Sequence, residues 1–320
     1  MKKTTIKQSK VKQYPKALQS RKGWSKYFDL KRPKEPHLHQ IEPTNYCPYS
    51  CIMCPRSDKM TRSTGYMDLD LYKKVIDEVD SFLEPVRSKE IELFHFGESL
   101  FHPDISEMIS YASFKGLKIV LSINSPQLTH DLGIQILKSN PYKIIISLDG
   151  YDSKSYKQIR GKAANYEKAV SNIEQFLSNR KIFASDSSVV IRMIKMKLNE
   201  HHTDTFKKTW TSKGVDVEIR PFFPWSEKEL VELGEFEKLP PFMPCGYPWQ
   251  YVVVQWNGDV VPCCRDYNAV MIMGNVRDNT LREIWNSVDY EALREQHRTG
   301  DYQNNSYCKD CMNIYYTEGT

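Results

Sequence analysis

The stretch Asn-Tyr-Cys-Pro-Tyr-Ser-Cys-Ile-Met-Cys at residues 45–54 carries three cysteines, Cys47, Cys51 and Cys54, at the spacing C-x3-C-x2-C. It follows a β-rich run at residues 39–44, so the thiols lie on the loop after the first predicted strand. Three thiolates on one short loop can ligate three irons of a [4Fe-4S] cube and leave the fourth iron open. Structural zinc sites take four protein ligands, and the nearest histidines precede this loop. The spacing predicts a catalytic iron-sulfur loop, with zinc or chance clustering as the alternative.

Around this loop, β-rich runs alternate with amphipathic helical patterns. Strands are predicted at residues 39–44, 90–96, 117–123, 143–148, 189–196 and 215–221, and helices at 68–83, 105–114, 128–137, 165–177 and 203–211. Six strands separated by helices of this length indicate consecutive βα units with parallel strands. Such a sheet either stays open or closes into all or part of a barrel. In both cases the active groups lie beyond the carboxyl ends of the strands.

The remaining cysteines lie in the last quarter of the chain. Cys245 and Cys263 flank an Asn257-Gly258 turn between predicted strands at residues 251–255 and 259–262, a strong hairpin signal, and Cys308 and Cys311 follow as C-x2-C. Helices are predicted near residues 281–285 and 290–296. Four thiolates from two distant pairs can close around one metal centre, and a zinc ribbon fits this spacing as well as an iron-sulfur cluster does.

The loop at residues 45–54, following a first strand, resembles the radical S-adenosylmethionine (SAM) superfamily. That resemblance implies an α/β fold built on a partial (β/α)6, TIM-like barrel. It also implies SAM bound to the open iron and cleaved to a 5'-deoxyadenosyl radical. The sequence Phe-Gly-Glu-Ser at residues 96–99 resembles the family's Gly-Gly-Glu-Pro loop, although only Gly97 and Glu98 match. Glycine permits close backbone approach, and a carboxylate suits the methionine ammonium.

Other SAM contacts are implied by the same resemblance at the ends of the third and fourth strands. Ser122, Asn124 and Ser147 resemble the positions that bind the ribose and neighbouring groups, with Asp149 beside them. Arg160 resembles the arginine that pairs with the methionine carboxylate, for which its planar fork is suited. Without the resemblance, the strand-end polar residues fit equally well as caps of backbone groups.

The C-terminal part resembles the SPASM/twitch extension of radical enzymes. The similarity lies in the pattern C-x12-G-x4-C, followed by Gly-Asn-Val at residues 274–276 and Leu-Arg-Glu-Ile-Trp at 281–285. It implies one auxiliary [4Fe-4S] cluster held by Cys245, Cys263, Cys308 and Cys311. We therefore expect two [4Fe-4S] clusters in all.

Cys264 is the one cysteine that the two expected clusters do not use. By resemblance to radical epimerases, its thiol is a candidate catalytic hydrogen donor to a substrate radical. The alternatives are a small buried apolar residue on the hairpin or a substitute for Cys263 as ligand. A dehydrogenase and an epimerase therefore compete on one scaffold.

The expected substrate is small and polar: a sugar, aminoglycoside or cyclitol. About 36 residues precede the first strand, whereas relatives that modify ribosomal peptides often carry a longer leader-recognition domain. A ribosomal-peptide maturase is the alternative enzyme, and a zinc-stabilised nucleic-acid-binding protein is the non-enzyme alternative. The chemistry also needs a flavodoxin- or ferredoxin-type electron donor.

Length, composition and charge fit an ordinary globular protein of about two domains. The 320 residues include 45 basic and 40 acidic side chains and 40% hydrophobic residues, which excludes disordered and coiled-coil classes. Residues 1–36 hold 12 basic and two acidic side chains, an expected solvated arm with nucleic-acid contact as the alternative. The predicted barrel occupies residues 37–223, a Pro/Glu-rich linker 224–244 and the SPASM/twitch domain 245–320. We expect no membrane partner and a cytoplasmic location.

Overall fold

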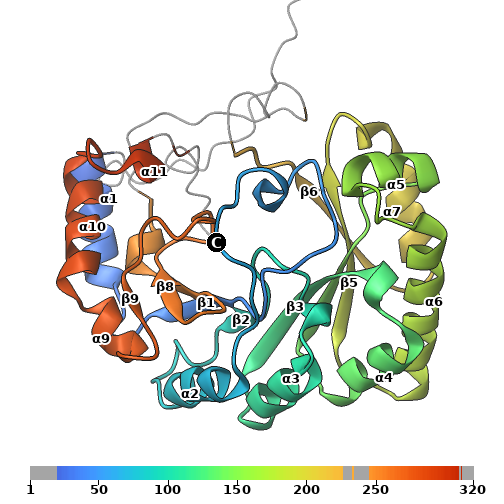
Figure 1. The fold of residues 1–320 in the computed structure, drawn as a ribbon, viewed down its shortest axis with the longest axis horizontal. Helices are drawn as coiled ribbons and strands as arrows, with labels where there is room; N and C mark the ends of the chain where they lie inside the picture. Colours follow the sequence, from blue (N-terminus) through green and yellow to red (C-terminus); the bar gives the residue numbers. More distant parts are fainter. Residues whose placement is uncertain (1–19, 226–232, 234–244, 310, 312–320) are drawn as a thin grey trace, which may run out of the picture.

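The computed structural model describes residues 20–225, 233, 245–309 and 311. In these residues nine strands form one sheet in the order β6-β5-β4-β3-β2-β1-β7-β8-β9. Strands β1 to β6 are parallel and lie in sequence order, as consecutive βα units require. The sheet curves, with the helices on its outer side (Figure 1). The predicted partial α/β barrel is confirmed, and residues 37–223 contain its six parallel strands.

The elements of the barrel lie close to the predicted ranges. The strands are β1 (His37–Ile41), β2 (Glu90–Glu92), β3 (Lys118–Asn124), β4 (Lys143–Ser147), β5 (Ser188–Lys195) and β6 (Asp216–Pro221). The helices are α2 (Leu69–Asp80), α3 (Ile105–Phe114), α4 (His130–Lys138), α5 (Ser153–Arg160), α6 (Tyr166–Ile182) and α7 (Thr203–Thr211). Short 3-10 turns are η2 (Pro55–Ser57), η3 (Ser99–Phe101), η4 (Ser125–Gln127) and η5 (Glu200–His202). Helix α5 was not predicted.

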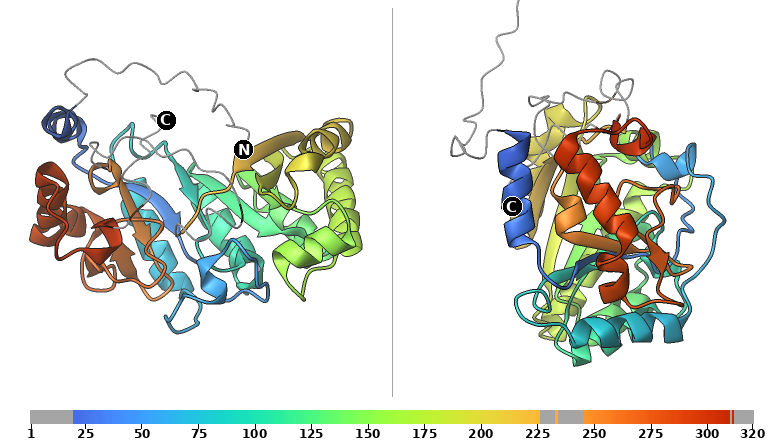
Figure 2. Two further views of the ribbon diagram at one scale, coloured as in Figure 1. Left: turned by 90° about the horizontal axis from the view of Figure 1, so that it is seen from above. Right: turned by 90° about the vertical axis from the view of Figure 1, so that its left-hand side faces the viewer.

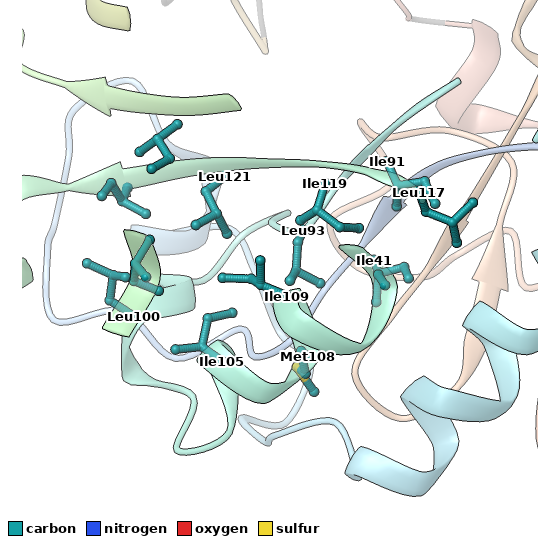
Figure 3. Close-up of a cluster of buried hydrophobic side chains, with 14 of the residues drawn as sticks. Ile41, Ile91, Leu93, Leu100, Ile105, Met108, Ile109, Leu117, Ile119 and Leu121 are labelled. Carbon is teal, nitrogen blue, oxygen red and sulfur yellow. The ribbon is translucent and has the colours of Figure 1, made fainter. Parts of the chain in front are cut away.

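Alternation along β3 sends one set of apolar side chains outward to the helices and leaves polar side chains on the inner face. Ile119, Leu121 and Ile123 of β3 are buried in the main core, while Ser122 and Asn124 take the opposite face. Figure 3 shows this core between β1–β3 and α3, with Leu121 and Ile119 above Ile105 and Ile109. The outer face of the sheet therefore supplies stability, and the inner face is left for chemistry.

The C-terminal region extends the same sheet. It contains η6 (Tyr247–Trp249), β7 (Tyr251–Val254), β8 (Asp259–Val261), β9 (Gly274–Asn275), α9 (Leu281–Trp285), α10 (Val288–Thr299) and α11 (Ser306–Lys309). Strands β7 and β8 form the predicted antiparallel hairpin, and Gly258 takes a left-handed φ of 95° in its turn. Strand β7 also pairs in parallel with β1, on the edge that β2 leaves free. The two cysteine-bearing regions therefore share one hydrogen-bonded sheet.

Part of the expected basic arm is a folded helix. Helix α1 (Arg21–Lys31) begins at Ser20, whose side chain accepts a hydrogen bond from Gly23 N, and packs against α10 and η6. Figure 2 shows it beside α10 at the edge of the molecule. Trp24 and Phe28 are buried, and the Phe28 ring stacks on Trp249 at 5.4 Å. This corrects the expectation of a solvated arm for residues 20–31; residues 1–19 lie outside the described part.

Other expectations fall partly on residues that the structure does not describe. Of the predicted linker 224–244, only residues 224, 225 and 233 are described. Among the described helices, none is long and apolar enough to cross a bilayer.

Candidate active site and auxiliary metal site

The three-cysteine loop is held against the end of α5. Ser50 N donates to Arg160 O at 3.2 Å and Ile52 N donates to Ile159 O at 3.0 Å. Gly161 permits this approach, because it takes a φ of 86° and a Cβ there would lie 2.1 Å from Ser50 Oγ. Helix α5 therefore fixes the middle of the loop.

Burial makes the three loop thiols poor sites for an uncompensated negative charge. It raises the pKa of Cys47 to about 12 and that of Cys54 to about 11, and it also raises the pKa of Cys51. A bound metal centre would offset this desolvation, because its positive charge stabilises thiolates. The donor chemistry of the loop fits an iron-sulfur cluster.

The Gly97-Glu98 turn lies directly beside the beginning of the cluster loop. A Cβ on Gly97 would lie 1.9 Å from Thr44 O, so only glycine allows this contact. Glu98 N donates to Tyr46 O at 2.8 Å. Glu98 is fully buried, and burial raises the pKa of its carboxyl to about 7, against hydrogen bonds from Asn124 and Leu100 that lower it. A carboxyl held in this way gains from a cationic ligand.

Arg160 links the predicted SAM contacts into one network. Its guanidinium donates to Asn124 Oδ1 at 2.7 Å, forms an ion pair with Asp149 and lies 3.7 Å from Cys51 Sγ. Asn124 in turn donates through Nδ2 to Glu98 Oε2 at 2.7 Å. Arg160 Nε is buried without a hydrogen-bond partner in the structure. An orphaned guanidinium N–H beside the cluster loop fits a ligand carboxylate.

Ser122 and Ser147 complete the predicted set on the inner face of the sheet. Asn124 pairs with Ser147 in the β3–β4 register, and Ser122 pairs with Ile145. Both serines are half-buried, whereas their strand neighbours Ile123 and Ile146 are buried in the outer core. The structure thus brings Gly97, Glu98, Ser122, Asn124, Ser147 and Arg160 to one edge of the barrel.

The second cysteine set converges on one cavity. Cys245, Cys263, Cys308 and Cys311 all line a cavity of about 190 Å³. Across the described residues, no three His, Cys, Asp or Glu side chains lie close enough to hold a single metal ion. Four thiols around a space several times larger than the ~30 Å³ of one water fit a cluster better than one zinc ion. Burial raises the pKa of Cys308 to about 12 and also raises that of Cys245.

Cys264 is placed differently from its neighbour Cys263, because it is not among the residues that line the cavity. Its Sγ lies 4.0 Å from the Tyr247 hydroxyl, and its backbone oxygen lies 2.8 Å from His95 Nε2. The lining of the cavity therefore favours Cys263, rather than Cys264, as the ligand.

A buried hub that the sequence did not reveal joins the two regions. Glu42, at the end of β1, is fully buried and accepts two hydrogen bonds of 2.8 Å from Arg62. Burial would raise the pKa of Glu42, but Arg62 and His95 lower it to about 2. His95 lies between, with Nδ1 3.4 Å from Glu42 Oε1 and Nε2 2.8 Å from Cys264 O. Its members are distant in the sequence and form no spaced motif.

An aromatic bridge also spans the two cysteine regions. Trp225 lines the cavity and donates from Nε1 to Met53 O, within the three-cysteine loop, at 3.0 Å. The Arg265 guanidinium lies 4.3 Å from the Trp225 ring centroid and 4.4 Å from that of Phe223. Met53 packs in an apolar cluster with Ile159, Met196 and Phe222. Isolated aromatic residues give no sequence signal for such a bridge.

Profile comparisons identify both regions independently. Residues 41–208 match the radical SAM superfamily, and residues 245–312 match SPASM, an iron-sulfur cluster-binding domain. The second match covers all four cysteines that line the cavity.

Individual relatives are distant. The chain is 21% identical to the S-adenosyl-L-methionine-dependent 2-deoxy-scyllo-inosamine dehydrogenase of Niallia circulans, over 86% of this chain and 92% of that protein. It is 24% identical to the subtilosin biosynthesis protein AlbA of Bacillus subtilis, over 77% of this chain and 59% of that protein. A match to the AdoMet-dependent heme synthase of Methanosarcina barkeri, at 27% identity, covers 43% of this chain and 38% of that protein. The chain thus spans less than two thirds of the latter two proteins.

Solved structures share the fold at low identity. BtrN in complex with AdoMet and 2-DOIA superposes with a TM-score of 0.55 at 18% identity, covering 86% of this chain and 92% of that chain. Streptococcus suis SuiB superposes with a TM-score of 0.60 at 15% identity, covering 92% of this chain and 75% of that chain. These likenesses support the architecture.

Proposed function

Because this chain belongs to the radical SAM superfamily and carries a C-terminal SPASM region, we propose that it removes a hydrogen atom from a carbon of a small polar substrate and inverts that carbon. The proposed substrate is a sugar, aminoglycoside or cyclitol. The observation that carries the inversion is the position of Cys264, which is not among the residues lining the four-cysteine cavity and whose Sγ lies 4.0 Å from the Tyr247 hydroxyl.

The residues of the first site would hold a [4Fe-4S] cluster and SAM. Cys47, Cys51 and Cys54 supply the cluster ligands; Glu98, with the Gly97 backbone, receives the methionine ammonium, and Arg160 its carboxylate. Ser122, Asn124 and Ser147 face the ribose side. When bound and reduced, this cofactor pair supplies the 5'-deoxyadenosyl radical that takes the substrate hydrogen. The protein's own residues would hold the reacting carbon of the substrate beside SAM and exclude water.

Cys264 then completes the proposed inversion. Its S–H bond breaks homolytically, and the hydrogen atom goes to the substrate carbon radical from the face opposite to abstraction. The sulfur is left lacking one electron and one proton. A flavodoxin- or ferredoxin-type donor would supply the electron and solvent the proton. Cys245, Cys263, Cys308 and Cys311 would hold the auxiliary cluster, which would supply one-electron chemistry in this part of the molecule.

The test uses anaerobically reconstituted protein, with candidate saccharides in deuterated solvent. Inversion places one deuterium on the reacting carbon. Cys264→Ala still forms 5'-deoxyadenosine but loses the inverted product. Iron and sulfide counts of about eight each per chain support the two clusters. Two zinc ions without sulfide, or a three-cysteine cluster that cannot cleave SAM after reduction, would exclude the proposal.

Oxidation is the second candidate. It is favoured by the similarity to the 2-deoxy-scyllo-inosamine dehydrogenase, which covers 86% of this chain. In an oxidation by this chain, the substrate radical would lose a proton to a base and its second electron to an acceptor, and a cluster held by Cys245, Cys263, Cys308 and Cys311 would be able to take that electron. The product is then lighter by two hydrogens, and Cys264→Ala has nearly the wild-type rate. Because AlbA is also similar to this chain, a peptide belongs in the same substrate panel.

A further inference from the structure

The inner face of β1 carries one more polar side chain than regular alternation allows. The β1–β7 register shifts between Leu38 and Gln40, which marks a β-bulge. Leu38 and Ile41 both remain in the outer core. His39 and Gln40, the two residues between them, therefore both reach the inner face. Bulges are frequent beside active sites, where they redirect a side chain.

Both redirected side chains meet the same carboxylate on the neighbouring strand. Glu92 lies between Ile91 and Leu93, which are in the outer core, so its side chain takes the inner face. Gln40 Nε2 donates to Glu92 Oε2 at 2.6 Å, and His39 Nε2 lies 3.9 Å from the same oxygen. The side chains of His39 and Glu92 retain 22% and 26% exposure, so solvent reaches them.

This group lacks one hydrogen bond. Gln40 is 7% exposed and its Oε1 has no hydrogen-bond partner in the structure, although its amide nitrogen is bound to Glu92. A buried carbonyl oxygen without a donor destabilises the protein, so the site is suited to receive an O–H or N–H. The same wall carries two tyrosine rings. The ring centroid of Tyr251 lies 4.9 Å from that of His39, and the ring centroid of Tyr247 lies 4.9 Å from that of Tyr251.

We propose that His39, Gln40 and Glu92 form a subsite for the donor groups of a polyhydroxylated or aminated ring, whose reacting carbon lies next to Cys264. The acceptors Gln40 Oε1 and Glu92 take neighbouring hydroxyl or amino donors of the ring, and Tyr251 and Tyr247 offer apolar surface to its C–H face. Cys264 is joined to the subsite through Tyr247, because its Sγ lies 4.0 Å from the Tyr247 hydroxyl and the centroid of the Tyr247 ring lies 6.4 Å from that of His39.

An extended peptide fits this wall poorly. Peptide strands bind by pairing with a free strand edge, but β1 is paired with β2 and β7, and β2 with β1 and β3. Only side chains are offered here, as a small polar ligand requires. This inference rests on the proposed function for the reacting carbon, but the subsite can be tested through binding alone.

The experiment measures equilibrium binding of three probes, myo-inositol, D-glucosamine and a neutral hexapeptide, to reconstituted, SAM-loaded and unreduced protein. Glu92→Gln and Gln40→Met each remove an acceptor with little change in shape. We expect each to weaken binding of at least one ring probe by tenfold or more, and the two ring probes separate hydroxyl from amino recognition.

Glu90→Gln is the matched control. Glu90 lies two residues before Glu92 on the same strand and the same face, and its carboxylate lies 3.6 Å from Lys143 Nζ. We expect it to change probe binding by less than twofold, and all three variants to keep wild-type iron content and SAM affinity. That retention shows that they are folded.

Three results would overturn the subsite: neither ring binds the wild type, the ring affinities are unchanged in both acceptor variants, or Glu90→Gln loses as much. Preferential binding of the hexapeptide, lost in Glu92→Gln, would likewise contradict it. If ring binding responds as expected but reduced protein fails to cleave SAM, the radical function falls and the subsite stands.

Discussion

Glu98 is a buried carboxyl with few compensating charges. Because burial raises its pKa to about 7, the carboxyl holds a proton at lower pH than that and loses it above. In the unfolded chain the Glu98 carboxyl loses its proton near the ordinary value of 4.5, whereas the folded protein keeps the proton up to about pH 7. The free energy of unfolding therefore falls as pH rises through this window. A cation at this position favours the ionised form, so ligand binding and deprotonation are linked.

The consequence is a pH-dependent SAM affinity. As pH falls through about 7, binding should weaken by up to tenfold per pH unit, because the proton on Glu98 must leave first. Calorimetric titration of unreduced, reconstituted protein between pH 6 and 8.5 measures the slope. Glu98→Gln should bind more weakly at pH 8 and lack the Glu98 part of this slope. An identical slope in the variant would show that another group is responsible.

Arg62 compensates the charge of Glu42, the buried carboxylate of the hub. Glu42 is fully buried and Arg62 only 9% exposed in its side chain. Removing one partner of such a pair leaves an uncompensated charge, so Arg62→Ala should destabilise the protein by about 3–5 kcal/mol. Chemical unfolding under anaerobic conditions measures this.

Arg87 provides a control for that prediction. It contacts Asp80 at 2.7 Å, but the two side chains are 29% and 30% exposed. Solvent screening limits such pairs, so Arg87→Ala should lose no more than about 1 kcal/mol. Equal losses in Arg62→Ala and Arg87→Ala would contradict the assigned role of burial.

Among the elements, α1 acts on the auxiliary site through packing. Phe28 lies against Gly246, where a Cβ would be 2.8 Å from its ring, and Gly246 follows the expected ligand Cys245. Arg21 of the same helix donates to His297 O at 3.1 Å, and His297 lines the four-cysteine cavity. The helix therefore supports two walls of that cavity.

Truncating this contact should affect one cluster and spare the other. Trp24→Ala with Phe28→Ala is expected to lower iron content from about eight towards about four per chain, because only the auxiliary site loses its support. Tyr27→Ala, at a side chain that is 39% exposed on the same helix, is the control. Iron analysis and electron paramagnetic resonance of reduced protein decide this; equal loss at both sites would contradict it.

Elements with strong periodicity could be predicted from the sequence. Helices α3 and α7 and the β7–β8 hairpin occur where apolar spacing and the Asn257-Gly258 turn indicate. Helix α1 was missed because its Lys and Arg residues suggested a solvated arm, whereas Trp24 and Phe28 bury against a partner more than 200 residues away. Strand β2 is shorter than expected because the chain turns towards Gly97.

Only part of the candidate site could be predicted from the sequence. Cysteine spacing predicted both groups of candidate ligands, because thiolate ligands need a fixed local geometry, and the four C-terminal cysteines line one cavity. The hub of Glu42, Arg62 and His95, the Trp225 bridge and the bulge at Gln40 escaped prediction. Each depends on which distant strands meet, and sequence periodicity does not encode that.

At the scale of the whole molecule, the C-terminal region is a structural part of the barrel. Val252 and Val254 of β7 belong to the same core as Leu38 and Ile41 of β1. A chain that ends at residue 223 should expose an unpaired edge of β1, and we expect this truncated protein to aggregate. Light scattering of purified protein measures this.

Aggregation of the truncated chain could come from loss of the auxiliary ligands or from loss of the β1–β7 pairing. A second variant separates these two causes by changing four residues to alanine: Cys245, Cys263, Cys308 and Cys311. It removes the auxiliary ligands but keeps the β1–β7 pairing. We expect it to keep the light scattering of the wild type and to bind about four irons per chain. A monomeric, cluster-binding truncated chain would contradict the dependence on the shared sheet.

The parallel pairing of β1 with β7 also bears on how such an enzyme can change over evolutionary time. Main-chain hydrogen bonds, such as that from Glu42 N to Val254 O at 2.9 Å, fix how far the three-cysteine loop stands from the four-cysteine cavity. Residues inserted or deleted in the covalent connection would leave that spacing intact. Changes in the connecting segment could thus alter substrate preference, while the distance between the three-cysteine loop and the four-cysteine cavity is inherited unchanged.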